Sequence, residues 1–301
     1  MPRVRFYGTE SSDYYDRRGR FRVPARARRR PRLRMPPRFI IGVVVALVSV
    51  VTYCSKSSVN PITGEKQRVS LTVDQEIALG LQSAPELAQQ HGGLSPDDAA
   101  QARVDRVGEK LLARELRRKS PYEFEFHLLR DPKTVNAFAL PGGQVFITEA
   151  LYSRLRTEGQ LAGVLGHEIG HVIERHSAQR IAKMELTQGL TGAAVLATYD
   201  PRNPVSRNSA AVAMVIGQLI TMKYGRTDEL ESDEWGVKLT AEAGYDPRAV
   251  IEVMKILREA SGGKGPPEFM STHPDPKNRI QRIEAAIRKR FPDGVPAGLT
   301  P

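Results

Sequence analysis

The pentapeptide His167-Glu168-Ile169-Gly170-His171 constrains the fold of this chain more than any other sequence feature. Its two histidines are four residues apart, so in a helix both imidazoles lie on one face, one turn apart. Apolar residues at helical spacing on both sides of the motif predict a buried helix over residues 158–184. Unliganded histidines and a charged glutamate are costly in a buried helix. The motif therefore indicates a metal site rather than two solvent-facing histidines.

The residue types in this motif fit a catalytic metal. Two histidines can bind one zinc ion, and Glu168 between them can accept a proton from a water molecule that zinc activates. The chain has one cysteine, Cys54, which excludes a cysteine-rich metal site and an intramolecular disulfide. The remaining ligands must therefore be histidines or carboxylates.

A catalytic zinc needs a third protein ligand, and a later helix offers a carboxylate. The position ten residues after His167, where a histidine would complete an astacin-like site, is Ser177, which excludes that class. The acidic segment 227–236 contains Glu229 and Asp233, four residues apart on one helical face. An acidic first turn is also common at a solvated helix N-terminus, so spacing alone leaves both interpretations of Glu229 open.

Residues 1–38 carry 13 arginines and three acidic residues, and so hold ten of the eleven net positive charges. This segment is expected to be a disordered cytoplasmic tail, because it has no apolar periodicity. Residues 39–54 contain no charge and follow the arginines directly, which is the positive-inside pattern of a transmembrane anchor. The alternatives are a buried core helix, a cleaved signal peptide, a lipoprotein and a mitochondrial presequence. The arginines are interpreted as a topology determinant that also contacts anionic lipid, and binding of an anionic polymer by this tail is the alternative. The rest of the chain is nearly neutral, and no specific nucleic-acid partner is expected.

After the anchor, the sequence predicts a mainly α-helical domain with a small β-sheet, an α+β fold. Residues 55–71 are expected to form a linker or a strap, residues 72–292 the folded domain, and residues 293–301 a disordered tail. The apolar segment 209–222 is short and contains Gln218, which favours a buried helix over a second membrane span.

The expected elements follow from periodicity and turn residues. Strands are expected at residues 123–129, 137–140 and 144–147. Helices are expected at residues 74–90, 96–119, 149–155, 158–184, 186–196, 208–224, 227–243, 247–259 and 277–290. Ser95 and Asp246 are expected N-caps, because a proline follows each of them at the first helical position.

Six motifs together resemble the gluzincin metallopeptidase family of the CAAX prenyl protease and HtpX, closest to the BepA-type and Oma-type quality-control proteases. In chain order they are Asn60-Pro-Ile-Thr-Gly-Glu-Lys-Gln, Asp74-Gln-Glu-Ile-Ala-Leu-Gly, Asn136-Ala-Phe-Ala-Leu-Pro-Gly-Gly, the His-Glu-Ile-Gly-His-Val run ending in Arg175-His176, the Glu229 to Asp233 helix, and Thr272-His273-Pro274. The resemblance covers residues 58–292. Gly225-Arg226 and Ser232-Asp233 depart from the usual Ser-Arg and Ala-Asp of the family, and leave the acids in place.

The resemblance implies the roles of the site residues. His167, His171 and Glu229 would bind one Zn²⁺ ion per chain, with Glu168 as general base and Asp233 as an acid that supports a ligand or donates a proton. His273 would contact the zinc at its fourth position and make the enzyme latent; a surface-loop histidine is the alternative. The expected substrate strand, for which an ordinary hairpin is the alternative, comprises Asn136, Ala137, Phe138, Pro141, Gly142 and Gly143.

These expectations combine into a membrane-anchored zinc metalloendopeptidase. The catalytic domain would lie on the periplasmic or extracytoplasmic side of the cell membrane and cleave unfolded or misassembled proteins in envelope quality control. The alternative is a zinc-stabilised chaperone-like or scaffold module that binds client proteins without cleaving them. Glu168 weighs against it, because a purely structural zinc site needs no base. His91 and His127 are expected to be structural.

Overall fold

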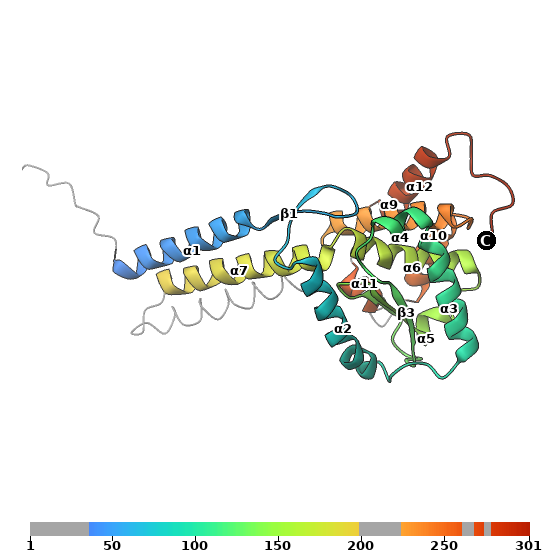
Figure 1. Cartoon of the computed structure of the whole chain (residues 1–301), viewed down its shortest axis with the longest axis horizontal. Helices are drawn as coiled ribbons and strands as arrows, with labels where there is room; N and C mark the ends of the chain where they lie inside the picture. The colour runs from blue at the N-terminus through green and yellow to red at the C-terminus, as the bar shows by residue number, and fades with distance from the viewer. Residues whose placement is uncertain (1–35, 199–223, 261–267, 274–277) are drawn as a thin grey trace, which may run out of the picture. The chain divides into compact units, whose positions relative to one another are not determined.

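Helix α6 (Glu158–Ile173) is the helix around which the rest of the domain is packed (Figure 1). The computed structural model describes residues 36–198, 224–260, 268–273 and 278–301. Every residue of α6 from Leu161 to Ile173 is buried. Thr157 caps the helix, because its hydroxyl accepts a hydrogen bond from the Gln160 N–H. The elements that contact α6 include α3 (Asp98–Leu111), α9 (Arg226–Glu242), α10 (Ala249–Glu259) and β4 (Ala137–Ala139).

Glycines on α6 allow α9 to approach it closely. A methyl group at Gly170 would lie 2.9 Å from Cβ of Trp235 and 3.0 Å from Cα of Ser232, both on α9. One turn earlier, a methyl group at Gly166 would lie 3.3 Å from Cα of Gly236. Real Cβ atoms essentially never make contacts shorter than 3.0 Å, and contacts of 3.0–3.4 Å are tighter than most. A side chain at Gly170 would therefore force α9 to shift, and one at Gly166 would be tight.

Three strands form a mixed sheet beside α6, in the order β3-β5-β4. β3 (Glu125–Leu129) runs parallel to β5 (Gln144–Thr148), and β4 runs antiparallel to β5 with Phe138 opposite Phe146. Within the described residues, β4 is therefore an edge strand, and it contacts α6. Each strand forms within two residues of its expected bounds.

The other helices of the domain are α2 (Val73–Gln90), α4 (Arg114–Lys119), α5 (Glu149–Tyr152), α11 (Glu268–Thr272) and α12 (Arg279–Arg290). Of these, α2, α5 and α12 begin within two residues of their predicted starts, whereas the sequence predicts no helix at α11. The prediction of a mainly α-helical fold with small sheets is confirmed. The expected tail, up to residue 35, and the expected helix at 208–224, up to residue 223, lie outside the described residues.

The predicted linker at residues 55–71 forms a hairpin that closes the C-terminal end of α6. Its strands β1 (Ser57–Val59) and β2 (Lys66–Arg68) pair antiparallel. The Asn60 side-chain amide donates to the Ile173 carbonyl at 2.8 Å, and the Gln67 amide donates to the Glu174 carbonyl at 3.1 Å. The last carbonyls of a helix have no partner within it, so these two amides satisfy them. The segment is a strap rather than a free linker.

Arg175 divides the helix that the sequence predicts over residues 158–184. Its φ of 56° is left-handed, which ends α6, and α7 (His176–Thr198) begins at the next residue. This conformation is costly for a residue with a side chain. A buried ion pair to Glu76 of α2, at 2.9 Å, holds it in place. The local sequence does not indicate the turn, because Glu76 lies 99 residues away.

Three predicted helix starts are wrong. The helix expected at 186–196 has no start of its own, because it is part of the continuous helix α7. The helix expected at 96–119 begins at Asp98 with Asp97 as its cap, and a break after Leu111 divides it into α3 and α4. Ser95 instead donates a hydrogen bond to Glu149 at 2.6 Å. Helix α10 begins at Ala249 rather than residue 247, and the Asp246 carboxylate accepts the Arg248 N–H within the preceding turn.

The expectation of a disordered C-terminal tail at residues 293–301 is also wrong. The Thr300 N–H donates to the Gly244 carbonyl at 3.0 Å, and the Thr300 carbonyl accepts the Asp246 N–H at 2.8 Å. The Pro301 carbonyl accepts the Gly159 N–H at 2.9 Å, beside the start of α6. These are backbone contacts, which the side chains of the tail do not reveal.

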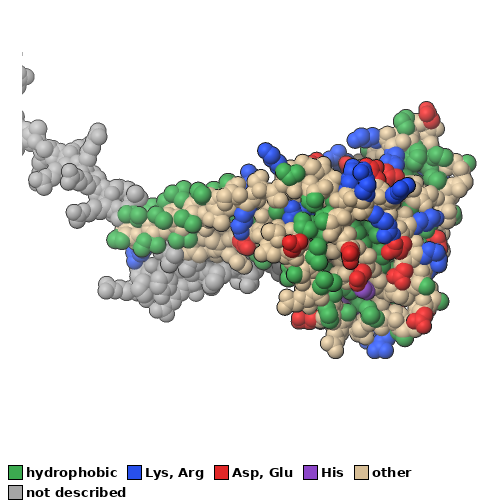
Figure 2. Space-filling view, in the orientation of Figure 1, with side chains coloured by type: hydrophobic (Ala, Val, Ile, Leu, Met, Phe, Trp, Pro, Cys, Tyr) green, Lys and Arg blue, Asp and Glu red, His purple; other side chains and the backbone are tan. Residues whose placement is uncertain are grey.

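The charge-free segment forms one helix, α1 (Pro37–Ser55), and it is the one helix among the described residues that is long and apolar enough to cross a membrane. Its 19 residues correspond to about 28 Å, close to the ~30 Å hydrocarbon core of a bilayer. Apolar side chains cover its visible surface (Figure 2). The exposed large residues are Phe39, Ile40, Ile41, Val43, Val44, Leu47, Val48, Val50 and Val51. This exposure excludes the buried core helix considered above.

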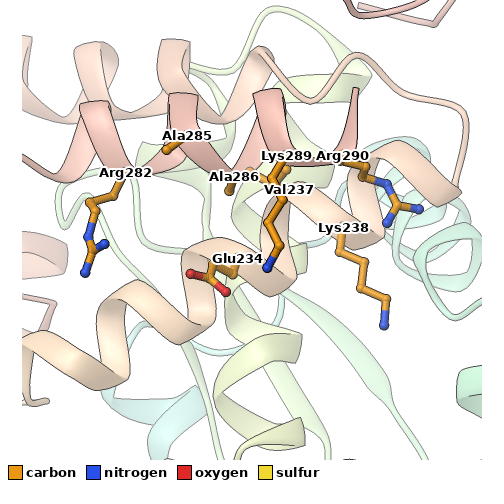
Figure 3. Close-up of a pocket in the computed structure, with 8 residues that line it drawn as sticks. All are labelled: Glu234, Val237, Lys238, Arg282, Ala285, Ala286, Lys289 and Arg290. Atoms are coloured by element: carbon orange, nitrogen blue, oxygen red, sulfur yellow. The ribbon is translucent and has the colours of Figure 1, made fainter. Parts of the chain in front are cut away.

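A surface groove lies between α9 and α12 (Figure 3). Its polar lining is mainly basic, with Lys238 from α9, and Arg282, Lys289 and Arg290 from α12. None of the residues that the sequence selects as ligands or base lines this groove. It is therefore a feature of the outer surface of α9, separate from the face that packs on α6.

Replacing Gly170 by alanine should destabilise the domain, because the added methyl group meets the α9 backbone. We expect Gly170→Ala to lower the free energy of unfolding by about 1–3 kcal/mol, measured by urea denaturation in detergent. Gly192→Ala in α7 is the control, since a methyl group there would meet no described atom within 4 Å apart from its chain neighbours and the backbone of its own helix. Equal stability of the two variants would show that α6 and α9 separate without cost.

Candidate metal centre

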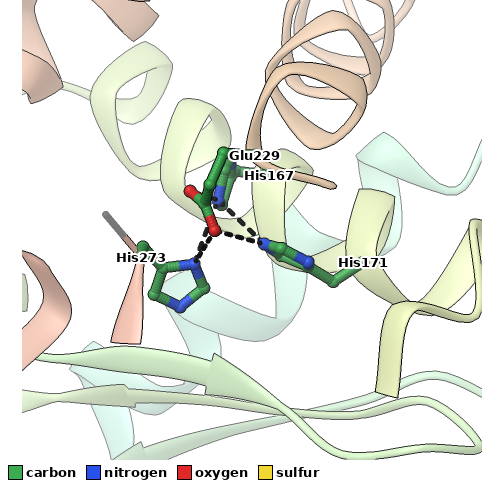
Figure 4. A group of neighbouring side chains, drawn as sticks. All are labelled: His167, His171, Glu229 and His273. Atoms are coloured by element: carbon green, nitrogen blue, oxygen red, sulfur yellow. Dashed lines mark hydrogen bonds and ion pairs between the residues drawn. The ribbon is translucent and has the colours of Figure 1, made fainter. Parts of the chain in front are cut away.

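Four side chains from α6, α9 and the residue after α11 converge on one point (Figure 4). They are His167 and His171 of α6, Glu229 in the first turn of α9, and His273. All four are buried, and one ligand atom of each lies within 4.8 Å of the others. The Nε2 atoms of the two α6 histidines are 3.1 Å apart, and the Glu229 oxygens lie 3.5 and 3.6 Å from them.

The spacing of these atoms fits a tetrahedral metal ion. Donors bound 2.0–2.1 Å from a tetrahedral zinc lie about 3.3–3.4 Å apart. His273 Nδ1 lies 3.1 Å from Glu229 Oε1 and 3.4 Å from His167 Nε2, so these separations are close to those of donors around one zinc ion. Imidazole and carboxylate donors with no thiolate suit zinc among the common metals. The residues present therefore fit the metal that the sequence predicts.

A proton competes with a metal ion at His167. Burial alone would lower the pKa of His167, but its hydrogen bonds to Asp233 and Glu229 raise it to about 9. Burial lowers the pKa of His171 well below its ordinary value, so that ring is neutral. A metal ligand must be deprotonated, and metal binding at neutral pH therefore releases a proton from His167.

Glu168 lies beside the four converging side chains without joining them. Its carboxylate is buried, and neither oxygen has a hydrogen-bond partner among the described residues. Oε1 lies 3.7 Å from Nε2 of His273. Burial raises the pKa of Glu168 above its ordinary value. A carboxylate with a raised pKa and free lone pairs is suited to take up and return a proton.

Asp233 and Arg279 form a buried pair behind His167. Asp233 Oδ1 lies 3.0 Å from His167 Nδ1, and the Arg279 guanidinium donates to both Asp233 oxygens at 2.7 and 2.8 Å. Burial alone would raise the pKa of Asp233, but Arg279 and His167 outweigh it and lower the pKa. The ionised carboxylate fixes the orientation of the His167 ring. Of the two roles expected for Asp233, this contact fits the supporting one.

His176 and Tyr224 support His171 in the same way. His176 Nδ1 lies 2.9 Å from His171 Nδ1, and its Nε2 lies 3.1 Å from Glu231. The Tyr224 ring stacks on His171 with centroids 4.1 Å apart. The Arg175-His176 run at the end of the motif is the only signal of the histidine contact, and the sequence holds no signal for Tyr224.

The free edge of β4 lies near the centre. The Asn136 carbonyl and the Leu140 N–H bond to β5 at 3.0 and 2.8 Å. Alternate residues of an antiparallel strand face opposite edges, so Ala137 and Ala139 direct their peptide groups away from β5. No described strand pairs with that edge. A small cavity separates the end of this strand from His171.

The turn after β4 is held by α2. Gly142 and Gly143 have φ values of 87° and 109°, which residues with side chains rarely adopt. A methyl group at Gly142 would lie 2.5 Å from Cα of Ile77, and one at Gly80 would lie 1.9 Å from the Pro141 carbonyl oxygen. Helix α2 therefore packs directly on the Pro141–Gly143 turn and fixes the end of the edge strand.

Helix α11 closes the centre. The Phe269 N–H donates to the Val135 carbonyl at 3.2 Å, next to the start of β4. The Phe269 ring stacks on His273 with centroids 4.4 Å apart. His273 and Glu168 are each only 1% exposed. A peptide therefore cannot reach the centre in this state.

Two histidines lie elsewhere. His91 pairs with Asp131 at 3.0 Å, and His127 bonds Gln144 at 2.8 Å within the sheet. Both contacts hold local structure together. The structural role expected for these residues agrees with these partners.

Comparison with known proteins shows the family. The model of peptidase family M48 matches residues 98–287. The chain therefore belongs to peptidase family M48, and the resemblance seen in the sequence motifs is confirmed. The match includes the HExxH helix, the Glu229 helix and His273.

Named relatives are similar over most of this chain. The mitochondrial metalloendopeptidase OMA1 of Schizosaccharomyces pombe is 30% identical over 227 residues, which cover 74% of this chain and 64% of the relative. The beta-barrel assembly-enhancing protease of Escherichia coli is 30% identical over 234 residues, which cover 73% and 45%. The mitochondrial metalloendopeptidase OMA1 of Bos taurus is 28% identical over 251 residues, which cover 80% and 48%. The chain thus spans between about half and two thirds of the length of these relatives.

Removing the Glu229 carboxylate should weaken zinc binding. We expect one zinc per chain and at least a hundredfold weaker binding in Glu229→Ala, measured by competition with a chelating dye. Glu234→Gln, on the same helix and exposed, should bind like the unmodified chain. Because the pKa of His167 is about 9, affinity should fall about tenfold per pH unit from pH 8 to pH 6.5. Unaltered affinity in Glu229→Ala would remove this residue from the metal site.

Breaking the buried pair behind His167 should be costly without metal. Arg279→Met leaves Asp233 and Glu229 without their buried cation, so we expect the zinc-free protein to lose about 3–5 kcal/mol in unfolding free energy. Arg282→Met, on the same helix and exposed, should cost less than about 0.5 kcal/mol. Chemical denaturation in a chelator measures both, and similar losses would contradict a specific role for Arg279.

Proposed function

We propose that this member of peptidase family M48 is a membrane-anchored zinc endopeptidase. The observation that carries the proposal is the buried set of four donor atoms with Glu168 beside it. A structural zinc site needs four ligands and nothing more. A buried carboxylate with no hydrogen-bond partner beside those ligands has no structural use, and it is placed where hydrolysis needs a base.

In this proposal His167, His171 and Glu229 hold the zinc. A bound zinc ion supplies Lewis acidity, which polarises a peptide carbonyl and lowers the pKa of water. Glu168 removes a proton from the attacking water and carries it towards the leaving amine. Asp233 keeps the His167 ring in the orientation and tautomer that bind metal through Nε2.

The substrate backbone would add to the sheet along β4. The peptide groups of Ala137 and Ala139 point to an unpaired edge, and an extended peptide could bond to them as a further antiparallel strand. Such pairing recognises the substrate through its backbone N–H and C=O groups rather than through a particular side chain. It would suit unfolded protein segments, which present an extended backbone.

His273 makes the described state a closed one. Its Nδ1 occupies the position that a substrate carbonyl or water would need, and α11 lies next to the start of the edge strand. We propose that the enzyme is latent until α11 and His273 move together. The stacked Phe269 ring couples the two, so His273 leaves the centre only when α11 shifts.

The cellular setting is inferred from α1 and from the relatives. An apolar helix behind an arginine-rich segment supports a single membrane anchor with the metal centre on the extracytoplasmic side. The relatives are named as a beta-barrel assembly-enhancing protease and as mitochondrial metalloendopeptidases. We propose unfolded or misassembled envelope proteins as the substrates.

A zinc-stabilised scaffold that binds clients without cleavage is the second candidate, and the closed centre favours it.

Cleavage of an unfolded protein distinguishes the two candidates. We expect the full chain with zinc in detergent to cleave reduced casein slowly, and His273→Ala to cleave it at least tenfold faster. Glu168→Gln in the His273→Ala background should lower kcat by about 10²–10⁴-fold while zinc still binds at one equivalent. Glu234→Gln is the matched control and should leave the rate unchanged.

Zinc binding without cleavage in every variant would support the scaffold. Cleavage that survives Glu168→Gln would contradict the role of that residue as the base.

A further inference from the structure

We propose that the uncharged half of α7, Leu186–Thr198, enters the lipid bilayer beside α1. Two helices of the chain would then enter the bilayer rather than one. The second is the later half of α7, whose first residue, His176, lies beside the metal centre. The proposal rests on the membrane anchoring by α1 in the function proposed above. It adds a second segment in contact with lipid.

The first observation is that α1 and α7 lie side by side along their lengths (Figure 1). The contact is close, because a methyl group at Gly189 of α7 would lie 2.2 Å from the Ser49 hydroxyl of α1. Gly42 on α1 and Ala193 on α7 are also buried, although most of α1 is exposed. Small residues at a helix contact are typical of helices that pack within membranes.

The two helices run in opposite directions. Lys56, just after α1, pairs with Glu185 on α7, whereas Ser49, earlier in α1, faces Gly189, later in α7. The part of α7 beyond Glu185 lies beside α1, so it enters a bilayer together with α1. The insertion of α1 and that of α7 cannot be separated without breaking this contact.

The second observation is where the charges of α7 stop. Arg180, Lys183 and Glu185 lie in its first half, and no charged residue occurs from Leu186 to Thr198. At the boundary, Glu185 accepts a hydrogen bond from Ser70 at 2.6 Å and pairs with Lys56, which immediately follows the α1 helix. The uncharged parts of both helices thus begin at the level of the Lys56–Glu185 pair, as expected at a membrane surface.

The third observation is the chemistry of the surfaces beyond this level. The exposed apolar side chains of α1 continue on α7 with Leu190, which is 39% exposed. The Thr187 hydroxyl donates to the Lys183 carbonyl at 2.8 Å, and the Ser49 hydroxyl donates to the Val45 carbonyl at 2.8 Å. These hydroxyls need no water, as hydrocarbon surroundings require. The arginines before α1 also favour a lipid bilayer over a protein groove as the partner.

The lengths allow insertion but not a full crossing by this part of α7. Leu186–Thr198 has 13 residues, or about 20 Å of helix, against the ~30 Å hydrocarbon core. The metal centre is near the surface in this arrangement, since His176 at the start of α7 contacts His171 and Glu185 is about 14 Å further along the helix. Substrate segments would therefore be those within reach of the membrane surface.

The test places a fluorophore at single cysteines in the full chain with Cys54→Ser, reconstituted in phosphatidylcholine and phosphatidylglycerol vesicles. Leu190→Cys and Lys183→Cys are matched, because they are seven residues apart on one face of α7 and both exposed. Val48→Cys on α1 reports the anchor. Each variant is labelled with an environment-sensitive dye, and brominated acyl chains serve as the quencher.

We expect quenching of at least twofold at Val48→Cys and Leu190→Cys, and none at Lys183→Cys. Quenching at Val48→Cys alone would overturn the insertion of α7 and leave the anchor standing. No quenching at Val48→Cys would overturn the anchor and, with it, the proposal. Equal quenching at Leu190→Cys and Lys183→Cys would also overturn it, because the boundary at Glu185 would not exist.

A cross-link measures the helix contact independently of depth. Ser49→Cys with Gly189→Cys, again with Cys54→Ser, should form an intramolecular disulfide in the vesicles, because the two side chains face each other. Failure to cross-link would contradict the pairing of α1 with α7 in the membrane. Zinc content at one equivalent per chain confirms that each variant is folded.

Discussion

The close contact between α6 and α9 is the constraint on which the metal centre depends. Two histidines on α6 are useful as ligands only if Glu229 approaches within 3.6 Å of both, and this requires two helix backbones with almost no side chain between them. Gly166 and Gly170 make that approach sterically allowed. The same contact removes several ionisable groups from water, which is costly unless each charge has a partner. His167 finds its partners at this crossing, because Asp233 and Glu229 lie on one face of α9. Arg279 of α12 supplies the cation that pairs with both carboxylates.

Elements far from the donor atoms hold the C-terminal end of α6 in place. The Asn60 amide closes the helix from the strap, Glu76 pairs with Arg175 from α2, and His176 contacts His171 from the start of α7. The left-handed conformation of Arg175 allows His176 to turn back towards the ligand it supports. Motifs such as Asn60–Gln67 and the start of α2 therefore belong to the centre through backbone and ion-pair contacts, although none of their atoms reaches the donor cluster.

The elements that could be predicted from the sequence are helices whose apolar periodicity is visible in their own residues. The features that could not be predicted depend on contacts between residues far apart in the chain. Apolar spacing around His167 and His171 was enough to predict a buried helix with a metal site. Helical projection could not separate Glu229 from a solvated first turn, because the direction of α9 depends on its crossing with α6. The turn at Arg175 and the ordering of the tail depend on partners elsewhere in the chain, and the tail contacts are backbone bonds that leave no side-chain pattern. Tyr224 contributes a stacked ring, for which the sequence holds no signal.

In the latent enzyme proposed above, the burial of His273 makes activity depend on the fraction of molecules in the open form. In a molecule that is closed 99% of the time, the apparent affinity for substrate is about a hundredfold weaker than that of the open form. Each change of about 1.4 kcal/mol in the stability of the α11 contacts would then alter proteolysis tenfold, with the zinc ligands and the base untouched. A ligand, a partner or a substitution at the Phe269 stack could thus set the rate over orders of magnitude. Under the proposed function, evolution could therefore adjust the rate of proteolysis through the α11 contacts while the zinc ligands and the base stay the same.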